Sequence, residues 1–541
     1  MSAQRWDLVV LGSGAAGLSA AVTAAHGGCR VLVLEKADEL GGTTAWSGGN
    51  VWVPNNPHAA EIGVEDSEDE AVEYLLSLSR GLMDPDLVRA FVRSGREMVA
   101  FMDDVADMRF FAYRDYPDYH AERPGGKAHG GRTLEAELFS FQDLGEWAHR
   151  VTVSPYYRRH QMMLETPTGS AVPRVVPEEE WARRAERDER GMGQALVGRL
   201  LRAALDLGVE FRTGTRGEEL VRDPSGRVTG VVVSTADGRD TVEADRGVVL
   251  ATGGFEWDER LRRAFLRGPL THPVTVPTNE GDGLRMAMRI GAMLGNMREA
   301  WWTTVTELPE GINRMNRFML SGDRSRPRSI MVNRQGRRFA NESTNYNAFG
   351  GAFHQEDTVA FDYANLPCWL VFDQGYLERF GTVGHPAPGP APEWVAAAPT
   401  LRELADRVGI DPEGLERTVE EWNANVAQGR DPHFHRGEFA HDRWWGDPSR
   451  KGTIEASLGP LDRGPFYAIP VHIGALGTKG GPQIDEAARV LSIDGDVIPG
   501  LYAAGNVMAS PFGMTYGGAG GTLGPAMTAG YLAGRHVAGS R

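Results

Sequence analysis

The pattern Gly12-x-Gly14-x-x-Gly17 constrains the fold of this chain more than any other feature of its sequence. It follows a short apolar run, Trp6–Leu11, and precedes a stretch of small helix-compatible residues and a second apolar run, Arg30–Leu34. This order predicts a strand, a tight turn, a helix and a second strand, which is the βαβ context that the glycine pattern requires. A glycine-rich turn without a ligand is the alternative interpretation.

The chemistry of this motif is that of a dinucleotide site. Gly12 permits the turn, Gly14 lets a pyrophosphate approach the backbone, and Gly17 allows the helix to pack closely on the strand. The phosphates would bind at the helix N-terminus, where backbone N–H groups are unpaired. Glu35 lies 18 residues after Gly17, about where an acidic residue binds ribose hydroxyls. The segment therefore predicts dinucleotide binding, and the carboxylate disfavours a 2′-phosphate.

Composition limits the remaining possibilities. The chain has 541 residues, enough for more than one domain, and a net charge of −16, which argues against nucleic acid as a partner. Its two cysteines, Cys29 and Cys368, cannot form a disulfide framework or a thiolate metal cage, and they favour a reducing compartment. We therefore expect a cytoplasmic globular protein.

One segment without charged residues, Val497–Gly534, could be mistaken for a membrane span in a hydropathy scan. Its many glycines and its prolines Pro511 and Pro525 are incompatible with a helix that faces lipid, so we expect no membrane span. Within it, Gly524-Pro525 predicts a helix start, with proline at the first helical position.

Further glycine elements indicate a discontinuous domain. Gly247–Gly254 reads as a strand that ends in a glycine turn, and Gly500–Asn506 is a similar element near the C-terminus. The predicted fold class is α/β, with a Rossmann-like nucleotide-binding domain formed by residues 1–283 and 464–541. Residues 284–463 form an inserted α+β domain, in which Thr400-Leu-Arg-Glu403 predicts the capped start of a helix that continues to Val408.

Several segments of this chain resemble those of a known protein family. Glu35-Lys36, Gly41-Gly-Thr-Thr-Ala-Trp-Ser-Gly-Gly49 and the two later glycine elements resemble the flavoproteins of the fumarate reductase/succinate dehydrogenase superfamily. Within it, the chain is most similar to the 3-ketosteroid Δ1-dehydrogenases. That likeness rests on Trp46–Asn55, Tyr116-Pro-Asp-Tyr119 with Pro124–Gly126, Ser329–Asn333, Arg337–Ser343, Gly477–Gly481, and Thr515-Tyr516 with Gly524–Thr528.

The resemblance implies a glutathione-reductase-type FAD domain that holds FAD non-covalently, with the substrate between the flavin and the inserted domain. The FAD contacts that it implies are Gly12, Gly14, Ala15, Ala16, Gly17, Glu35, Lys36, Gly42, Thr43, Thr44, Ser47, Gly48, Gly49, Ala251, Thr252, Gly253, Gly505, Asn506, Gly521 and Leu523.

The resemblance also implies a catalytic set that desaturates a cyclic ketone next to its carbonyl. Tyr346, paired with Tyr119, removes the α-proton as a tyrosinate, and a hydride passes to FAD. Tyr516 O–H and Gly520 N–H hold the enolate oxygen. An unperturbed tyrosine titrates near ~10, so neighbours must lower the pKa of the base. Tyr116 competes with Tyr119 for the partner role.

The implied partners are a small hydrophobic ketone, most closely a steroid, and an external electron acceptor such as a quinone. Two departures from the family pattern favour a different substrate shape. The family often shows Tyr-Pro-Gly-Pro-Gly where this chain has Tyr516-Gly-Gly-Ala-Gly520, and Arg328 replaces a frequent glycine, which predicts a more positive pocket wall.

Three alternatives stay open. A related enzyme could desaturate the 4,5 bond, or an ene-reductase could use Arg324 or Arg326 as its acid. A flavoprotein subunit that relays electrons within a complex is the alternative from another class, although the chain has no cysteine cluster for iron–sulfur. No metal site is predicted, because His433, His435 and His441 lie in a polar run without an obvious second layer of ligands.

Overall fold

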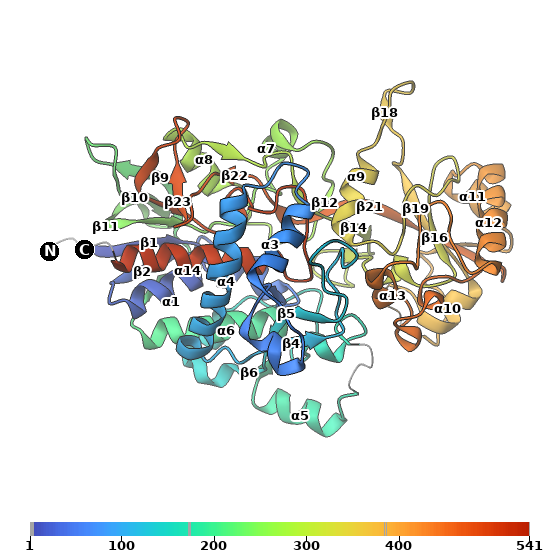
Figure 1. The fold of residues 1–541 in the computed structure, drawn as a ribbon, viewed down its shortest axis with the longest axis horizontal. Helices are drawn as coiled ribbons and strands as arrows, with labels where there is room; N and C mark the ends of the chain where they lie inside the picture. Colours follow the sequence, from blue (N-terminus) through green and yellow to red (C-terminus); the bar gives the residue numbers. More distant parts are fainter. Residues whose placement is uncertain (1–4, 171–174, 384, 386, 540–541) are drawn as a thin grey trace.

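The computed structural model describes residues 5–539 except 171–174, 384 and 386. Its ribbon has a larger lobe, which contains the first and last elements of the chain, and a smaller lobe built from the middle of the chain (Figure 1). Each lobe is organised around its own sheet.

The sheet of the larger lobe has β1 near its centre, with β2 and β11 as parallel neighbours. Val9 pairs with Leu32 on one side and with Val248 on the other. β1 and β2 are almost wholly buried because helices cover this part of the sheet. All their residues except Asp7 are accordingly apolar. The strand order is β23 (Arg489–Leu491), β24 (Val497–Ala503), β11 (Gly238–Leu250), β1 (Trp6–Leu11), β2 (Val31–Leu34) and β8 (Glu210–Arg212). In addition, β10 (Val228–Thr235) pairs with β11, and β9 (Arg216–Arg222) pairs with β10.

Helix α1 follows the first glycine turn and packs against α14 and α6. Gly17 sits at the α1–β1 contact, where an added Cβ would lie 2.0 Å from the Gly12 carbonyl oxygen. Around the larger lobe lie α1 (Ala15–His26), α2 (Gly42–Trp46), α3 (Glu68–Ser77), α4 (Pro85–Ala106), α5 (Glu178–Glu186), α6 (Met192–Asp206), α7 (Glu259–Phe265), α8 (Asp282–Arg289) and α14 (Leu523–Gly539).

A small third sheet, which was not predicted from the sequence, holds the loop that contains Tyr116 and Tyr119. Its strands are β3 (Val51–Trp52), β5 (Gly130–Ala136) and β4 (Phe110–Arg114). Trp52 from β3 donates its Nε1–H to Asp118 Oδ1 at 2.8 Å, and Arg132 from β5 donates to Asp118 Oδ2 at 2.8 Å. These bonds fix the loop between β4 and β5.

The sheet of the smaller lobe is built around the long strand β21, which pairs with β14 through its second half and with β19 through its first half. The predicted boundary at 464 falls just before β21, so this sheet takes its longest strand from residues beyond the boundary. The lobe contains β12 (His272–Pro273), β14 (Ala300–Glu307), β15 (Arg317–Met319), β16 (Ser329–Asn333), β19 (Cys368–Asp373), β20 (Ala396–Ala398), β21 (Phe466–Thr478), α9 (Phe349–Phe353), α10 (Gln374–Phe380), α11 (Leu401–Val408), α12 (Pro412–Ala427) and α13 (Ala440–Trp445).

Two predicted helix starts can now be compared with the structure. Thr400 caps α11 as expected, because its hydroxyl accepts a bond from Glu403 N at 3.2 Å. The helix predicted to start at Gly524-Pro525 is present as α14, which begins at Leu523, so Pro525 is its third residue and not its first. Pro525 still lies in the first turn, where its missing N–H leaves no intrahelical bond unmade.

Candidate active site

One cavity, with a volume of about 460 Å³, collects most of the residues predicted to bind the cofactor. Its wall includes Gly12, Gly14, Ala15, Ala16, Glu35, Lys36, Gly42, Thr43, Thr44, Ser47, Gly48, Gly49, Ala251, Thr252, Gly253, Gly505, Asn506 and Leu523. Gly17 and Gly521 are not in this wall. Gly17 instead serves helix packing, and Gly521 lies against the Tyr516 ring.

The cavity wall fits a dinucleotide by its own chemistry. Helix α1 begins after Gly14, which has no side chain to cap it. Ala15 N donates to Thr44 Oγ1 at 3.0 Å, and the N–H groups that follow it in the first turn stay available to an anion. Glu35 is held at the wall by Ser13, whose N and Oγ donate to Glu35 Oε2 at 3.1 and 2.7 Å. Lys36 is less available than predicted, because its Nζ pairs with Glu280 at 3.0 Å and with Asp282 at 2.8 Å.

Three buried tyrosines from distant parts of the chain meet in the same cavity. Tyr119 lies between β4 and β5, Tyr346 opens the short 3₁₀ helix Tyr346–Ala348, and Tyr516 precedes α14. The Tyr119 hydroxyl donates to the Tyr346 hydroxyl at 2.9 Å. The Tyr516 ring centroid lies 5.2 Å from that of Tyr119 and 5.5 Å from that of Tyr346. The structure thus brings together the three predicted catalytic tyrosines.

Gly520 completes this group, because it also lines the cavity. Its φ of +99° favours glycine, and an added Cβ would lie 2.5 Å from the carbonyl group of Asn50. Its N–H makes no hydrogen bond to any residue in the described part of the chain, whereas its carbonyl accepts one from Trp52 N at 3.1 Å. The backbone therefore offers one free donor near Tyr516.

The structure separates Tyr116 from Tyr119. Tyr116 also lines the cavity, but its ring stacks on Trp444 with the centroids 5.2 Å apart, and Tyr119 is the residue that binds Tyr346 directly. This geometry favours Tyr119 as the partner.

Burial acts against ionisation of these tyrosines. It raises the pKa of Tyr119 and Tyr346 well above the ordinary value for a phenol, and it raises the pKa of Tyr516 as well. The expectation that neighbours lower the pKa of Tyr346 is therefore not met by the tyrosine pair itself. A base at Tyr346 needs a positive charge nearby.

The expected effect of Arg328 was wrong. Arg328 does not line the cavity, and its guanidinium is paired with Asp373 and Asp462. Its neighbour Arg326 is in the cavity wall instead, with Nη1 3.1 Å from Asp323 Oδ1. The other departure from the family pattern is glycine in place of proline after Tyr516. It has a packing reason, because a Cβ at Gly517 would lie 2.7 Å from the Trp52 ring.

Sequence reasoning missed many residues of the cavity wall. They are Asn50, Tyr156, Tyr157, Met163, Thr168, Asn279, Phe318, Met319, Asp323, Trp445 and Leu476. They come from loops, short helices and strands that are far apart in the chain, so no periodicity in the sequence connects them. The adjacent tyrosines Tyr156 and Tyr157 were the one local sequence signal for this part of the wall.

The three histidines considered as a metal site do not act together. His433 pairs with Glu421 and His435 with Glu438, both exposed, whereas His441 is buried with its ring 5.0 Å from that of Tyr119.

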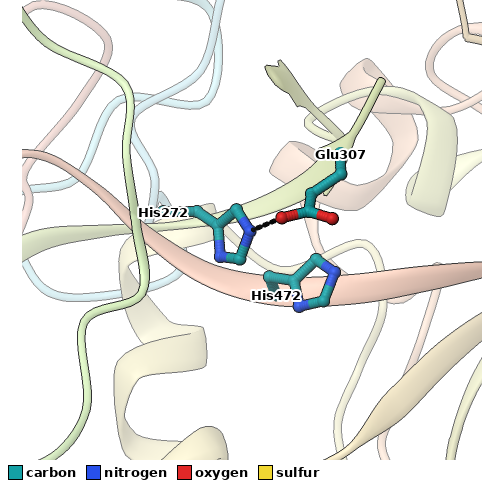
Figure 2. Close-up of side chains that lie close together, drawn as sticks. All are labelled: His272, Glu307 and His472. Atoms are coloured by element: carbon teal, nitrogen blue, oxygen red, sulfur yellow. Dashed lines mark hydrogen bonds and ion pairs between the residues drawn. The ribbon is translucent and has the colours of Figure 1, made fainter. Parts of the chain in front are cut away.

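A second histidine group lies on the sheet of the smaller lobe (Figure 2). His272 Nε2 lies 2.8 Å from Glu307 Oε1, and the rings of His272 and His472 stack with their centroids 4.2 Å apart. Imidazole lone pairs lie in the ring plane, so two stacked rings do not direct them at one point. Glu307 and His272 thus form a hydrogen-bonded pair, and His472 stacks on His272. None of these three residues lines the cavity.

Fold and cavity together define a flavoprotein that works as an FAD-dependent dehydrogenase. The FAD binding domain family matches residues 7–523, and the chain belongs to this family. The fold is the one found in fumarate reductase-type flavoproteins. No helix among the described residues has the length and apolar character needed to cross a membrane.

Three similar proteins extend this assignment. The chain is 46% identical to 4-oxocyclohexanecarboxylate 2-dehydrogenase of Sinomonas cyclohexanicum, over 99% of this chain and 93% of the relative. It is 38% identical to 3-oxosteroid 1-dehydrogenase of Mycobacterium tuberculosis, over 99% of both chains. The structure of 3-ketosteroid Δ1-dehydrogenase from Sterolibacterium denitrificans, in complex with 1,4-androstadiene-3,17-dione, superposes with a TM-score of 0.90 at 34% identity, covering 99% of this chain and 100% of the other.

Proposed function

We propose that this enzyme introduces a double bond next to the carbonyl of a cyclic ketone, and that its substrate is a 3-ketosteroid desaturated at C1–C2. The observation that carries this proposal is the convergence of Tyr119, Tyr346, Tyr516 and Gly520 N–H on one cavity. The match to proteins named 3-oxosteroid 1-dehydrogenase and 3-ketosteroid Δ1-dehydrogenase covers 99% and 100% of their length, and this likeness supports the choice of substrate.

Desaturation removes one proton and one hydride from adjacent carbons. FAD, when bound, supplies the hydride acceptor. Tyr346 takes the α-proton on its phenolate oxygen, and the Tyr119 hydroxyl, 2.9 Å away, donates a hydrogen bond that stabilises this oxygen while it is anionic.

The developing negative charge on the ketone oxygen needs donors. Tyr516 O–H and Gly520 N–H supply two in a site from which water is largely excluded, where such bonds are strong. Thr522 Oγ1 lies 2.9 Å from Tyr516 Oη and can donate to it, which leaves the tyrosine proton free for the substrate.

The test is anaerobic mixing of the FAD-loaded protein with androst-4-ene-3,17-dione while flavin absorbance is followed. Bleaching with formation of the 1,4-diene is expected. A fully FAD-loaded sample that does not bleach would exclude this substrate. Activated alkenes offered to chemically reduced enzyme would then test the reductive direction.

A second candidate substrate is a monocyclic keto acid of the 4-oxocyclohexanecarboxylate type. The relative that is 46% identical over 99% of this chain carries that name, and the cavity wall includes the guanidinium-bearing residue Arg326. The same bleaching assay, run with both ketones, discriminates by the ratio of kcat/KM. A higher value for the keto acid would replace the steroid assignment.

Turnover also needs an external electron acceptor. A quinone or similar compound, non-covalent attachment of FAD and a cytoplasmic location are part of this proposal.

A further inference from the structure

Arg324 is 1% exposed and contacts the loop that carries Tyr346. It sits in a short 3₁₀ helix, Asp323–Ser325, and its guanidinium rests over the Phe349 ring at 4.6 Å. Its Nη1 donates to the carbonyl oxygens of Glu342 and Thr344, the latter at 2.8 Å. Thr344 lies two residues before Tyr346, so Arg324 is attached to the loop that carries the base.

The charge of Arg324 is not matched by a carboxylate. Within the described residues, Arg324 has no ion pair, and its Nε has no hydrogen-bond partner. Two other buried guanidiniums nearby are matched. Arg338 pairs with Glu342 at 2.6 Å and with Asp431 at 2.8 Å, and Arg436 pairs with Glu342 at 3.2 Å. Glu342 and Asp431 therefore pair with Arg338 and Arg436, and neither makes an ion pair with Arg324.

An unpaired buried charge is costly, so its presence beside a reaction centre calls for an anion that pairs with it during the reaction. Asp442 is not this anion. Among the described residues its carboxylate makes no ion pair with Arg324, and it accepts hydrogen bonds from Asn341 Nδ2 at 2.9 Å and Gly437 N at 3.0 Å instead. The mechanism forms two anions, the enolate held by Tyr516 and the tyrosinate at Tyr346. Arg324 is bonded to the loop that carries Tyr346, so the tyrosinate is the anion placed to pair with it.

Electrostatics link the cation to Tyr119, whose hydroxyl binds that of Tyr346. Burial raises the pKa of Tyr119 well above its ordinary value, and the positive charge of Arg324 acts in the opposite direction. Burial lowers the pKa of Arg324 to about 9, so the guanidinium stays charged at neutral pH. The other titratable or charged groups around this arrangement are Tyr116, Tyr516, His120 and His441 near the hydroxyls, and Glu342, Asp442 and Arg436 near the guanidinium.

We infer that Arg324 is the counter-charge of the base: its guanidinium stabilises the anion shared by the Tyr119 and Tyr346 hydroxyls. Arg324 is a positioning residue, because its contacts are with the base-carrying loop and not with the cavity, whose wall does not include it. The inference rests on the proposed function, since it assigns a role within the same reaction.

The test compares two variants that differ in charge. Arg324→Gln keeps an N–H donor for the loop carbonyls but is neutral, whereas Arg324→Lys keeps both donor and charge. In the FAD-loaded enzyme, the rate of flavin reduction by ketone should rise with pH as the base ionises. Arg324→Gln should move this rise to higher pH by about one unit or more, and therefore lower the rate about tenfold at a pH below it. Arg324→Lys should leave its position near that of the wild type.

Arg436→Gln is the matched control, because Arg436 is equally buried and also donates to backbone carbonyls, Ser329 O at 2.7 Å and Arg326 O at 2.8 Å. It should destabilise the protein without moving the pH profile. If Arg324→Gln lowers the rate at all pH values but leaves the profile in place, its role is structural and the inference is wrong. Arg324→Met carries the same expectation if the Gln variant is not recovered folded.

A second readout does not depend on turnover. Alkaline titration of the oxidised holoenzyme, followed by the ultraviolet difference spectrum of tyrosinate, should show a transition that is absent from Tyr346→Phe. That transition should move to higher pH in Arg324→Gln. If no ketone bleaches the wild type, the proposed function fails while this titration still decides the role of Arg324, and an unmoved transition would overturn it.

Discussion

Tyr346 is the residue on which proton removal depends. Tyr346→Phe keeps the ring, which packs edge-on against Tyr119 and Tyr516, and removes only the oxygen. We expect flavin reduction by ketone to slow by roughly 10²–10⁴-fold, the usual contribution of a positioned base. Stopped-flow absorbance measures this rate, and the FAD content of the purified variant should equal that of the wild type. A rate within a few fold of normal would remove Tyr346 from the mechanism.

Tyr516 acts on the other side of the reacting bond. Tyr516→Phe should slow the reaction by ~10²–10³-fold, because one donor to the enolate oxygen is lost. Since a ketone oxygen accepts the same bond before reaction, KM should rise as well, and steady-state kinetics separates the two effects. Tyr531→Phe is the control, because Tyr531 is a buried tyrosine of α14 that does not line the cavity. An equal loss in both variants would mean that the effect is one of packing.

At the scale of residues, the sequence predicted which residues form the candidate site better than it predicted how they lie relative to one another. Tyr119 and Tyr346 are 227 residues apart, and no periodicity or spacing connects them; only the family resemblance placed them together. The choice between Tyr116 and Tyr119 needed coordinates, because it depends on which ring stacks on Trp444. Arg324 had been considered only as a possible acid, since burial and the absence of a carboxylate partner are not visible in a sequence.

At the scale of elements, the contact between α1 and β1 is the most sharply constrained. A Cβ at Gly17 would lie 2.0 Å from Gly12 O and 3.2 Å from Val10 Cγ1, so Gly17→Ala must push the helix away from the strand. We expect a loss of about 1–3 kcal/mol in the free energy of unfolding and weaker FAD binding, because the first turn of α1 moves. Thermal melts and FAD titration measure the two effects.

Gly351→Ala is the control for this change. Gly351 lies within α9 and is exposed, and an added Cβ would meet nothing within 4 Å. Alanine there should stabilise slightly, by roughly 0.5–1 kcal/mol, through its better helix propensity. If both alanine variants behave alike, the helix–strand contact is not what limits stability.

The elements around this contact were predictable because their signals are local. β1 has the predicted bounds, and β2 begins one residue later than expected, since an apolar run and a glycine turn encode both. The third sheet was not predicted, because Val51 pairs with Leu134 and no local pattern records a partner so distant in the chain.

At the scale of the whole molecule, the cofactor cavity is shared by segments from most of the chain. Its wall runs from Leu11 to Ala526 and includes Phe318, Tyr346 and Trp445, so residues of the predicted inserted segment 284–463 line it together with residues of the predicted FAD domain. The course of β21 could not be predicted, because one uninterrupted strand pairs with β19 through its first half and with both β14 and β12 through its second half. The sheet of the smaller lobe is in this way tied directly to the segment that leads back to the cavity.

Because so many segments meet at this cavity, removal of FAD should loosen the whole molecule and not one loop. A ligand that binds only the folded state stabilises it by about 2.7 kcal/mol when its free concentration is 100 times Kd. We expect protein stripped of FAD to melt at a lower temperature, and the Tm to rise again with the logarithm of added FAD. Hydrogen exchange should quicken together in the start of α1, in α2 and in the turn after β24, which line the cavity from three parts of the chain. Faster exchange in only one of these segments would show that FAD binds locally and does not hold the larger lobe together.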